Sequence, residues 1–266
     1  MERKRIFNPI VAAAVALTLL IAWNLFKSVS PTTAKQPTSL TLSAAISLSP
    51  ALQELKTVYQ QINPNVTITY NFGASGALAQ QIQQGAPVDV FFSAATKQMN
   101  DLQQSNLLIN DTRRNLLTNR LILITPKNGV ALSDFKQLID ARIKKIAIGE
   151  PKSVPVGQYA QEMLTKLGLW QQLQPKLVLA NNVRQVLTFV ESGNVDAGIV
   201  YGTDATASDK VTVLLTAAEN LHSPIVYPLA VIKNSRNPAA AKAFVDFLAG
   251  DRAKIVFQKY GFGIVR

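Results

Sequence analysis

The sequence predicts an α/β protein with mostly parallel sheets. Short apolar strands alternate along most of the chain with helical segments of about 10–15 residues, which is the pattern of βαβ units. Apolar residues make up 48% of the 266 residues and charged residues 16%, so the chain has enough material for a folded core. No internal repeat of solenoid length is found.

Two kinds of apolar pattern predict the strands. Val66, Ile68, Tyr70 and Phe72 alternate with polar residues, as in a strand with one buried face, whereas Leu121–Ile124 is a continuous run typical of a strand buried on both faces. The predicted strands are residues 40–44, 66–72, 88–92, 121–124, 146–148, 177–179, 196–201, 211–215 and 225–232.

Apolar residues at helical spacing, bounded by proline, glycine or asparagine, predict the helices. Pro64 ends the first helix, and Asn181 and Asn182 are candidate caps of a later one. Ser75 occupies the N-cap position of a short helix that follows the small-residue turn 73–76. The other predicted helices are residues 48–62, 97–104, 132–139, 158–167, 183–190, a helix opened by Pro238, and 251–260, with a polar connector through Arg114.

The N-terminus has the pattern of an export signal. Arg3, Lys4 and Arg5 precede an apolar run over residues 10–26, and a polar stretch follows. About 17 apolar-rich residues is long for a cleaved signal and near the lower limit for a membrane span. We therefore expect residues 1–37 to be a signal peptide cleaved near Ala34, or a retained anchor plus linker, with the body outside the cytoplasm.

Composition excludes several kinds of site. The chain has no cysteine, which rules out thiolate metal sites, disulfides and a lipid-modified cysteine. The net charge is +11, but lysines and arginines are scattered beyond the N-terminus, so no nucleic-acid surface is predicted. His222 is the only histidine and is expected to lie on the surface.

No catalytic motif is present, and we expect no enzyme activity. Neither Ser47 nor Ser75 has a histidine positioned to activate it. The remaining carboxylates of interest are scattered and are expected to act as caps, turn residues or partners between elements: Asp89, Glu150, Asp196 and Asp204.

Small or hydroxyl residues stand at four predicted helix starts. These are Ser47, Ser75, Val156 and Val183, and Tyr201 ends a predicted strand. Orphan N–H groups and the helix dipole favour anions at such starts, and α/β proteins bind ligands at the carboxyl ends of their strands. If these ends converge, they form a neutral, amide-lined anion site.

Five motifs, in order and spacing, carry a resemblance to a known family, and KYGFGI near the C-terminus adds to them. With them the chain resembles the molybdate-binding proteins of bacterial ABC importers from Leu40 to its end. The motifs are SAAISLSPALQ, FGASGALAQQIQQGAPVDVFFSA, GEPKSVPVGQYAQEML, NNVRQVL and GIVYGTDA.

The resemblance implies a two-lobed periplasmic-binding-protein fold of type II, with two mixed or parallel sheets and two crossover strands. Lobe 1 would comprise residues 38–120 and 226–266, and lobe 2 residues 121–225, with hinges near Asn119-Arg120 and Val226-Tyr227.

The resemblance also implies which groups bind the oxyanion: hydroxyls of Ser47 and Ser75, backbone amides of Val156 and Val183, and Tyr201. It implies no cofactor and no direct cation ligand. Two positions depart from the family pattern: residue 76 is glycine where a hydroxyl is frequent, and residue 156 is valine where alanine is usual.

The expected function is capture of molybdate, and also of tungstate, outside the cytoplasm for delivery to the permease of an ABC importer. We expect a monomer, periplasmic or tethered through residues 10–26. Tungstate matches molybdate in size, whereas sulfate is smaller and should bind more weakly. The alternatives are a receptor for another oxyanion such as sulfate, an enzyme on the same scaffold, and a membrane-tethered oxyanion sensor.

Overall fold

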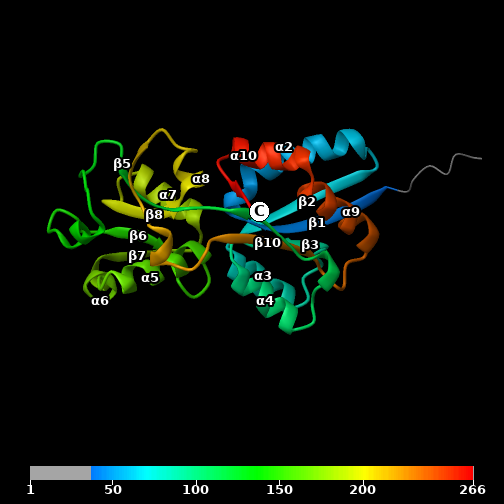
Figure 1. The fold of residues 1–266 in the computed structure, drawn as a ribbon, viewed down its shortest axis with the longest axis horizontal. Helices are drawn as coiled ribbons and strands as arrows, with labels where there is room; N and C mark the ends of the chain where they lie inside the picture. Colours follow the sequence, from blue (N-terminus) through cyan, green and yellow to red (C-terminus); the bar gives the residue numbers. More distant parts are fainter. Residues whose placement is uncertain (1–36, 266) are drawn as a thin grey trace, which may run out of the picture. The chain divides into compact units, whose positions relative to one another are not determined.

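The computed structural model describes residues 37–265. Within this range the chain folds into two lobes, each built around its own sheet (Figure 1). The predicted export or anchor segment, residues 10–26, and the cleavage position near Ala34 lie outside the described residues.

The sheet of lobe 1 has six strands in the order β11-β4-β10-β3-β1-β2. Strand β1 pairs in parallel with β2 and β3, while β10 runs antiparallel to both β3 and β4, and β11 antiparallel to β4. The bounds are β1 Thr38–Ala45, β2 Val66–Gly73, β3 Val90–Phe92, β4 Arg114–Thr118, β10 Val226–Val231 and β11 Gly263–Ile264.

The sheet of lobe 2 has five strands in the order β7-β6-β8-β5-β9. Strand β6 pairs in parallel with β7 and β8, and β5 runs antiparallel to β8 and β9. The bounds are β5 Leu121–Pro126, β6 Ile146–Gly149, β7 Leu177–Ala180, β8 Ala197–Tyr201 and β9 Val211–Thr216.

Both sheets are therefore mixed, as the family resemblance implies. The expectation of mostly parallel sheets from the strand–helix alternation is wrong for the strands that lead the chain from one lobe to the other. The chain leaves lobe 1 between Thr118 and Leu121 and returns between Thr216 and Val226. Strands β4, β5, β9 and β10 flank these crossings, and all their pairings are antiparallel. The exact lobe boundaries, 38–120 with 226–266 and 121–225, remain a proposal.

Helices cover both faces of the first sheet (Figure 1). Because side chains alternate along a strand, Val90 and Phe92 join the main core while Phe91 joins a separate cluster with Leu78 of α3 and Leu102 of α4. The helices are α2 Ser49–Ile62, α3 Ser75–Gln83, α4 Thr96–Gln104, α9 Pro238–Ala249 and α10 Asp251–Lys259.

In lobe 2 the buried strands pack against amphipathic helices. Helix α7 buries one stripe, Val183, Val186, Leu187 and Val190, at the spacing of a single helix face. The helices are α5 Pro155–Lys166, α6 Trp170–Leu173, α7 Val183–Glu191 and α8 Gly202–Ala205.

Several predicted elements differ in extent. Strands β4 and β11 were not predicted. Strand β4 has five residues, of which only Leu117 is buried, and β11 has two residues, so neither shows a strand pattern. The predicted helix 132–139 is a 3-10 helix, η3, limited to Phe135–Ile139, since Asp134 caps it. Helix α5 begins at Pro155, before the predicted residue 158, because proline suits the first helical turn.

None of the helices in residues 37–265 is long and apolar enough to cross a membrane. Over the same range, no group of three or more acidic or histidine side chains is arranged to hold a metal ion.

Candidate functional site

All five predicted ligand residues line one cavity between the lobes. Ser47 and Ser75 reach it from lobe 1, and Val156, Val183 and Tyr201 from lobe 2. The cavity has a volume of about 10 Å³, room for about one water molecule. A tetrahedral oxyanion is larger than this, so it can enter only if the walls of the cavity move apart. The other lining residues are Ala45, Ile46, Gly73, Ala74, Ala94, Val154 and Pro155.

The Ser75 hydroxyl has its acceptor side occupied. The N–H of Ala94, in the loop after β3, donates to Ser75 Oγ over 2.9 Å, and Ser75 is fully buried. The prediction that Ser75 is the N-cap of its helix is wrong: Ala74 holds that position, and the Ser75 side chain caps no helix amide. With Oγ accepting from Ala94, its own proton is free to be donated into the cavity.

The Ser47 hydroxyl lies within hydrogen-bond distance of a tyrosine that does not line the cavity. Ser47 lies in the 3-10 helix η1, Ile46–Leu48, and its Oγ is 3.1 Å from Oη of Tyr227. Tyr227 Oη also accepts from Nδ2 of Asn119 over 3.2 Å. Ser47 is thereby connected to residues at both chain crossings.

Val156 and Val183 stand in the first turns of α5 and α7. Amide N–H groups in a first turn have no intrahelical acceptor, so both are available to an anion. Asn182 accepts from the N–H of Gln185, which confirms its predicted role as the cap of α7.

Tyr201 ends β8 with its ring buried, 1% exposed, and its hydroxyl has no hydrogen-bond partner within residues 37–265. Burial raises the pKa of Tyr201 well above its usual value, so the hydroxyl keeps its proton. A buried donor without a partner is costly, and a ligand oxygen in the cavity would supply the missing acceptor.

The buried carboxylate of Asp204 lacks the hydrogen-bond donors that buried carboxylates normally have. Asp204 of α8 is 1% exposed, and neither of its oxygens accepts a hydrogen bond from the described residues. Arg184 Nη2 lies 3.9 Å away, an ion pair between α7 and α8. Burial raises the pKa of Asp204 to about 7, with the Arg184 charge acting against that rise.

The other singled-out carboxylates have structural roles. Asp89 accepts from the Thr41 amide and the Ser235 hydroxyl, and Asp196 accepts from the amides of Lys144 and Lys145. Glu150 accepts from the Lys152 amide over 3.3 Å. These residues were expected to be caps, turn residues or partners between elements.

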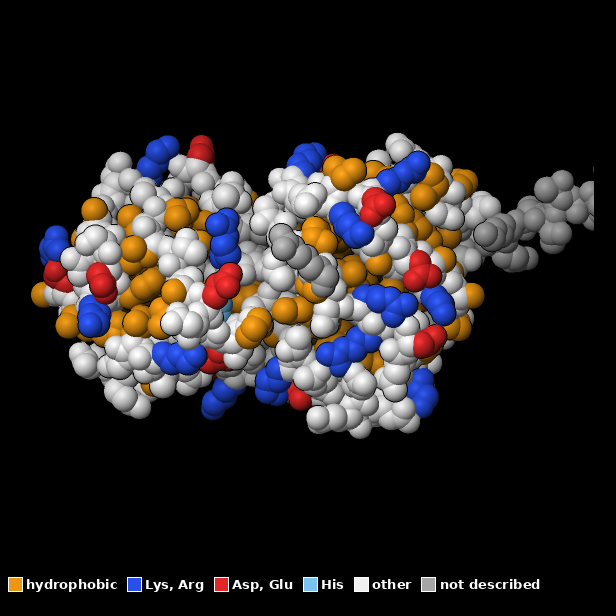
Figure 2. Space-filling model, in the orientation of Figure 1, with side chains coloured by type: hydrophobic (Ala, Val, Ile, Leu, Met, Phe, Trp, Pro, Cys, Tyr) orange, Lys and Arg blue, Asp and Glu red, His pale blue; other side chains and the backbone are white. Residues whose placement is uncertain are grey.

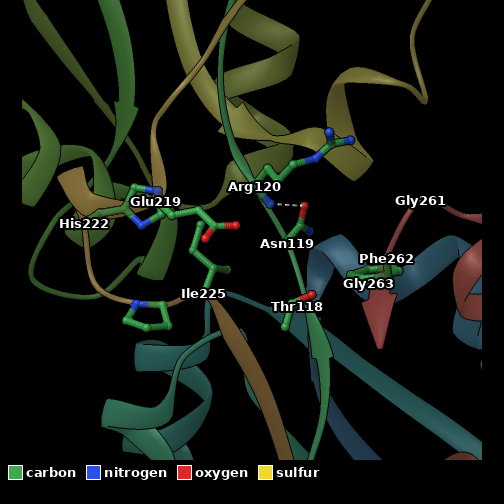
Figure 3. A pocket seen from close by; sticks show the side chains of 10 residues that line it. Thr118, Asn119, Arg120, Glu219, His222, Ile225, Gly261, Phe262 and Gly263 are labelled. Atoms are coloured by element: carbon green, nitrogen blue, oxygen red, sulfur yellow. Dashed lines mark hydrogen bonds between the residues drawn. The ribbon is translucent and has the colours of Figure 1, made fainter. Parts of the chain in front are cut away.

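A second, larger cavity of about 530 Å³ lies at the chain crossings (Figure 3). Arg120 and Glu219, both exposed, and His222 line it. The prediction of a surface histidine is wrong, since His222 is 7% exposed, packs on the Tyr159 ring and bonds through Nδ1 to the Ser223 carbonyl. This cavity mixes charges of both signs and gathers none of the predicted donors.

The smaller cavity is lined by uncharged residues. None of the described residues around the cavity of Ser47 and Ser75 is charged. Figure 2 shows lysine and arginine side chains dispersed over both lobes among acidic ones on the face of the molecule that it presents. An anion there would be held by neutral donors.

Three contributors were missed by sequence reasoning. The Ala94 amide fixes Ser75, and Asn119 and Tyr227, which sequence marked only as hinge positions, fix Ser47. Tyr227 lies 180 positions from Ser47, so local periodicity holds no signal for the pair.

The chain is similar to known proteins over most of its length. Residues 40–263 match the model of a family described as bacterial extracellular solute-binding protein. The Bacillus subtilis protein YvgL, named for a proposed role as an ABC transporter substrate-binding lipoprotein, is 43% identical over 95% of this chain and 96% of its own.

Two further matches carry molybdate in their names. The Escherichia coli molybdate-binding protein ModA is 40% identical over 85% of this chain and 89% of its own. The solved periplasmic molybdate-binding protein of Azotobacter vinelandii is 26% identical, covers 85% of this chain and 100% of its own, and superposes with a TM-score of 0.77.

Proposed function

The chain belongs to the family of bacterial extracellular solute-binding proteins, and on that premise we propose that it captures molybdate, and tungstate, between its two lobes. The observation that carries the proposal is the convergence of Ser47, Ser75, Val156, Val183 and Tyr201 on one uncharged cavity. The names of its relatives support molybdate as the ligand.

The proposed mechanism is binding by hydrogen bonds alone. A dianion is costly to bury without compensation, and donors from several elements spread that compensation over its oxygens. Hydrogen bonds to charged groups contribute roughly 1.5–3 kcal/mol each, so several can support micromolar binding after the lobes have been ordered. No cofactor and no cation are part of this proposal.

Closure of the lobes would complete the site. The Gly76 N–H of lobe 1 donates to the Ser153 carbonyl of lobe 2 over 3.0 Å, which joins the two walls beside the cavity. Such a closed surface is what a membrane permease could distinguish from the open one. We therefore propose delivery of the ion to an ABC importer by a monomeric, non-enzymatic receptor.

The proposed location is outside the cytoplasm. The family name and the lipoprotein name of YvgL support export. The 266 residues contain no cysteine for a lipid, so a tether would use the apolar residues 10–26. N-terminal sequencing of the mature protein distinguishes a cleaved from a retained segment.

Calorimetric titration of purified residues 35–266 with molybdate, tungstate and sulfate tests the function. We expect comparable affinities for the first two and much weaker binding of sulfate, because the smaller ion leaves its donors under-contacted. Sulfate binding as tight as molybdate binding would contradict the size argument and favour a general oxyanion receptor. Absence of binding for all three would contradict the proposed function.

A further inference from the structure

We infer that Asn119 and Tyr227 are positioning residues that fix the direction of the Ser47 hydroxyl, so that it donates to the ligand and favours oxyanions that carry no proton. This inference rests on the proposed function, because the two residues act on the ligand through Ser47. Neither of them lines the cavity itself. Asn119 lies at the first chain crossing and Tyr227 just after the second.

The orientation of the Asn119 amide is set by the backbone. Its Oδ1 accepts from the N–H of Arg120 over 2.9 Å (Figure 3). The opposite orientation would bring two donors together. The Nδ2 group therefore points to Oγ1 of Thr203, 3.0 Å away in lobe 2, and to Oη of Tyr227 at 3.2 Å.

The direction of the Tyr227 proton follows. Tyr227 is fully buried, and burial raises its pKa well above the usual value, so the phenol stays protonated. Its oxygen already accepts from Asn119, and its one proton needs an acceptor. Ser47 Oγ, 3.1 Å away, supplies that acceptor.

Ser47 then accepts from Tyr227 and has its own proton left for the cavity that it lines. Ser75 is in the same state, since its Oγ accepts from the Ala94 amide. Both serines thus present protons to the cavity. An oxyanion without a proton matches them, whereas one that carries a proton needs an acceptor and meets donors.

Asn119→Asp reverses this chain of hydrogen bonds with little change in shape. A carboxylate at residue 119 still accepts from Arg120, but it also accepts from Tyr227. Tyr227 then accepts from Ser47, and Ser47 turns an unshared electron pair toward the ligand. The added charge weakens binding of any dianion, so the effect of the reversal must be separated from the effect of charge.

A double-mutant cycle with Ser47→Ala makes that separation in the full-length protein. We expect Asn119→Asp to weaken molybdate binding by at least about tenfold more when Ser47 is present than when it is alanine. Tyr227→Phe serves as a second, uncharged variant, and its loss should also depend on Ser47. Equal losses in the two Ser47 backgrounds, or no loss at all, would overturn the inference.

Hydrogen arsenate provides a second readout in mildly alkaline buffer, where it is a dianion that still carries one proton. Its charge equals that of molybdate, so a pure charge effect lowers both affinities equally. We expect Asn119→Asp to gain hydrogen arsenate binding relative to molybdate by at least about tenfold. No relative gain would overturn the selectivity, and a wild-type protein that does not bind molybdate would instead contradict the proposed function.

Discussion

At the scale of the residue, the site depends on hydroxyls whose acceptor side is already used. Ser75 accepts from the Ala94 amide and Ser47 lies against Tyr227, so each has a proton to give. Tyr201 adds a buried hydroxyl without a partner among residues 37–265. In the proposed site each of these groups gains an acceptor when an oxyanion enters, so binding does not require a cation.

Ser75→Ala should weaken molybdate binding by at least about tenfold, because one donor to the dianion is lost and the Ala94 amide loses its acceptor. Calorimetry measures the affinity, and circular dichroism checks that the fold persists. Ser105→Ala is the matched control, since this serine is exposed and bonds only within α4 and its end. An unchanged affinity in Ser75→Ala would remove Ser75 from the site.

Asp204 should make stability fall as pH rises. Its folded pKa is raised from 3.8 to about 7, so between these values the folded state binds a proton that the unfolded state has released. Raising the pH through this window therefore destabilises the folded state, by an amount on the order of a few kcal/mol. Below the window both states are protonated and the effect vanishes.

Urea unfolding of wild type and Asp204→Asn over this pH range measures the effect. Asparagine keeps the shape and does not titrate, so all other groups cancel in the difference. We expect the variant to gain stability relative to wild type as pH rises. Parallel curves would show that Asp204 is charged throughout, held by Arg184.

At the scale of the element, the start of α3 is shaped by the opposite lobe. A Cβ at Gly76 would collide with the Ser153 carbonyl oxygen and lie 2.8 Å from the Cα of Ser153. Glycine at this position therefore permits the close approach in which the Gly76 amide bonds to Ser153. Residue 76 is glycine where the family often has a hydroxyl residue, and the contact between the lobes leaves no room there for a side chain.

Gly76→Ala should weaken molybdate binding while leaving the unliganded protein at least as stable. Alanine favours a helix over glycine, although at the second residue of α3 by less than the ~1 kcal/mol of a helix interior, and its Cβ collides with Ser153 when the lobes close. Opposite signs for stability and affinity distinguish this mechanism from local unfolding. Calorimetry and thermal unfolding measure the two quantities, and Ala77→Ser, at an exposed neighbour, should change neither by much.

At the scale of the whole molecule, the proposed donors are divided between two lobes, which would couple ligand binding to closure. Ser47 and Ser75 belong to the six-stranded sheet's lobe, and the other three predicted residues to the five-stranded one. Neither lobe holds the full set of donors. We therefore expect tight binding to require both lobes and the ligand to stabilise them together.

Molybdate at about 100 times its dissociation constant should stabilise the folded protein by ~2.7 kcal/mol. For a domain of this size that corresponds to a rise in Tm of roughly 5–10 °C. Differential scanning calorimetry should show a single transition that moves as a whole. A rise confined to one of two separate transitions would show that one lobe binds the ion alone.

The order of most strands and helices could be predicted from the sequence, because hydrophobic periodicity records which face of each element is buried. The five candidate ligand residues came from the resemblance to the molybdate-binding family, which the motifs and their spacing carry. The structure brings these five to one cavity, and their role as ligands remains a prediction.

The tertiary structure alone decided which groups face one another across long separations. The bond between Ser47 and Tyr227 joins residues 180 positions apart, and Gly76 meets Ser153 across the two lobes. The burial of Asp204 and the pairing of β4 with β10 and β11 are of the same kind. Periodicity records that a side chain is buried but not against what, so hydrogen-bond direction and close approach appear only when the chain has folded.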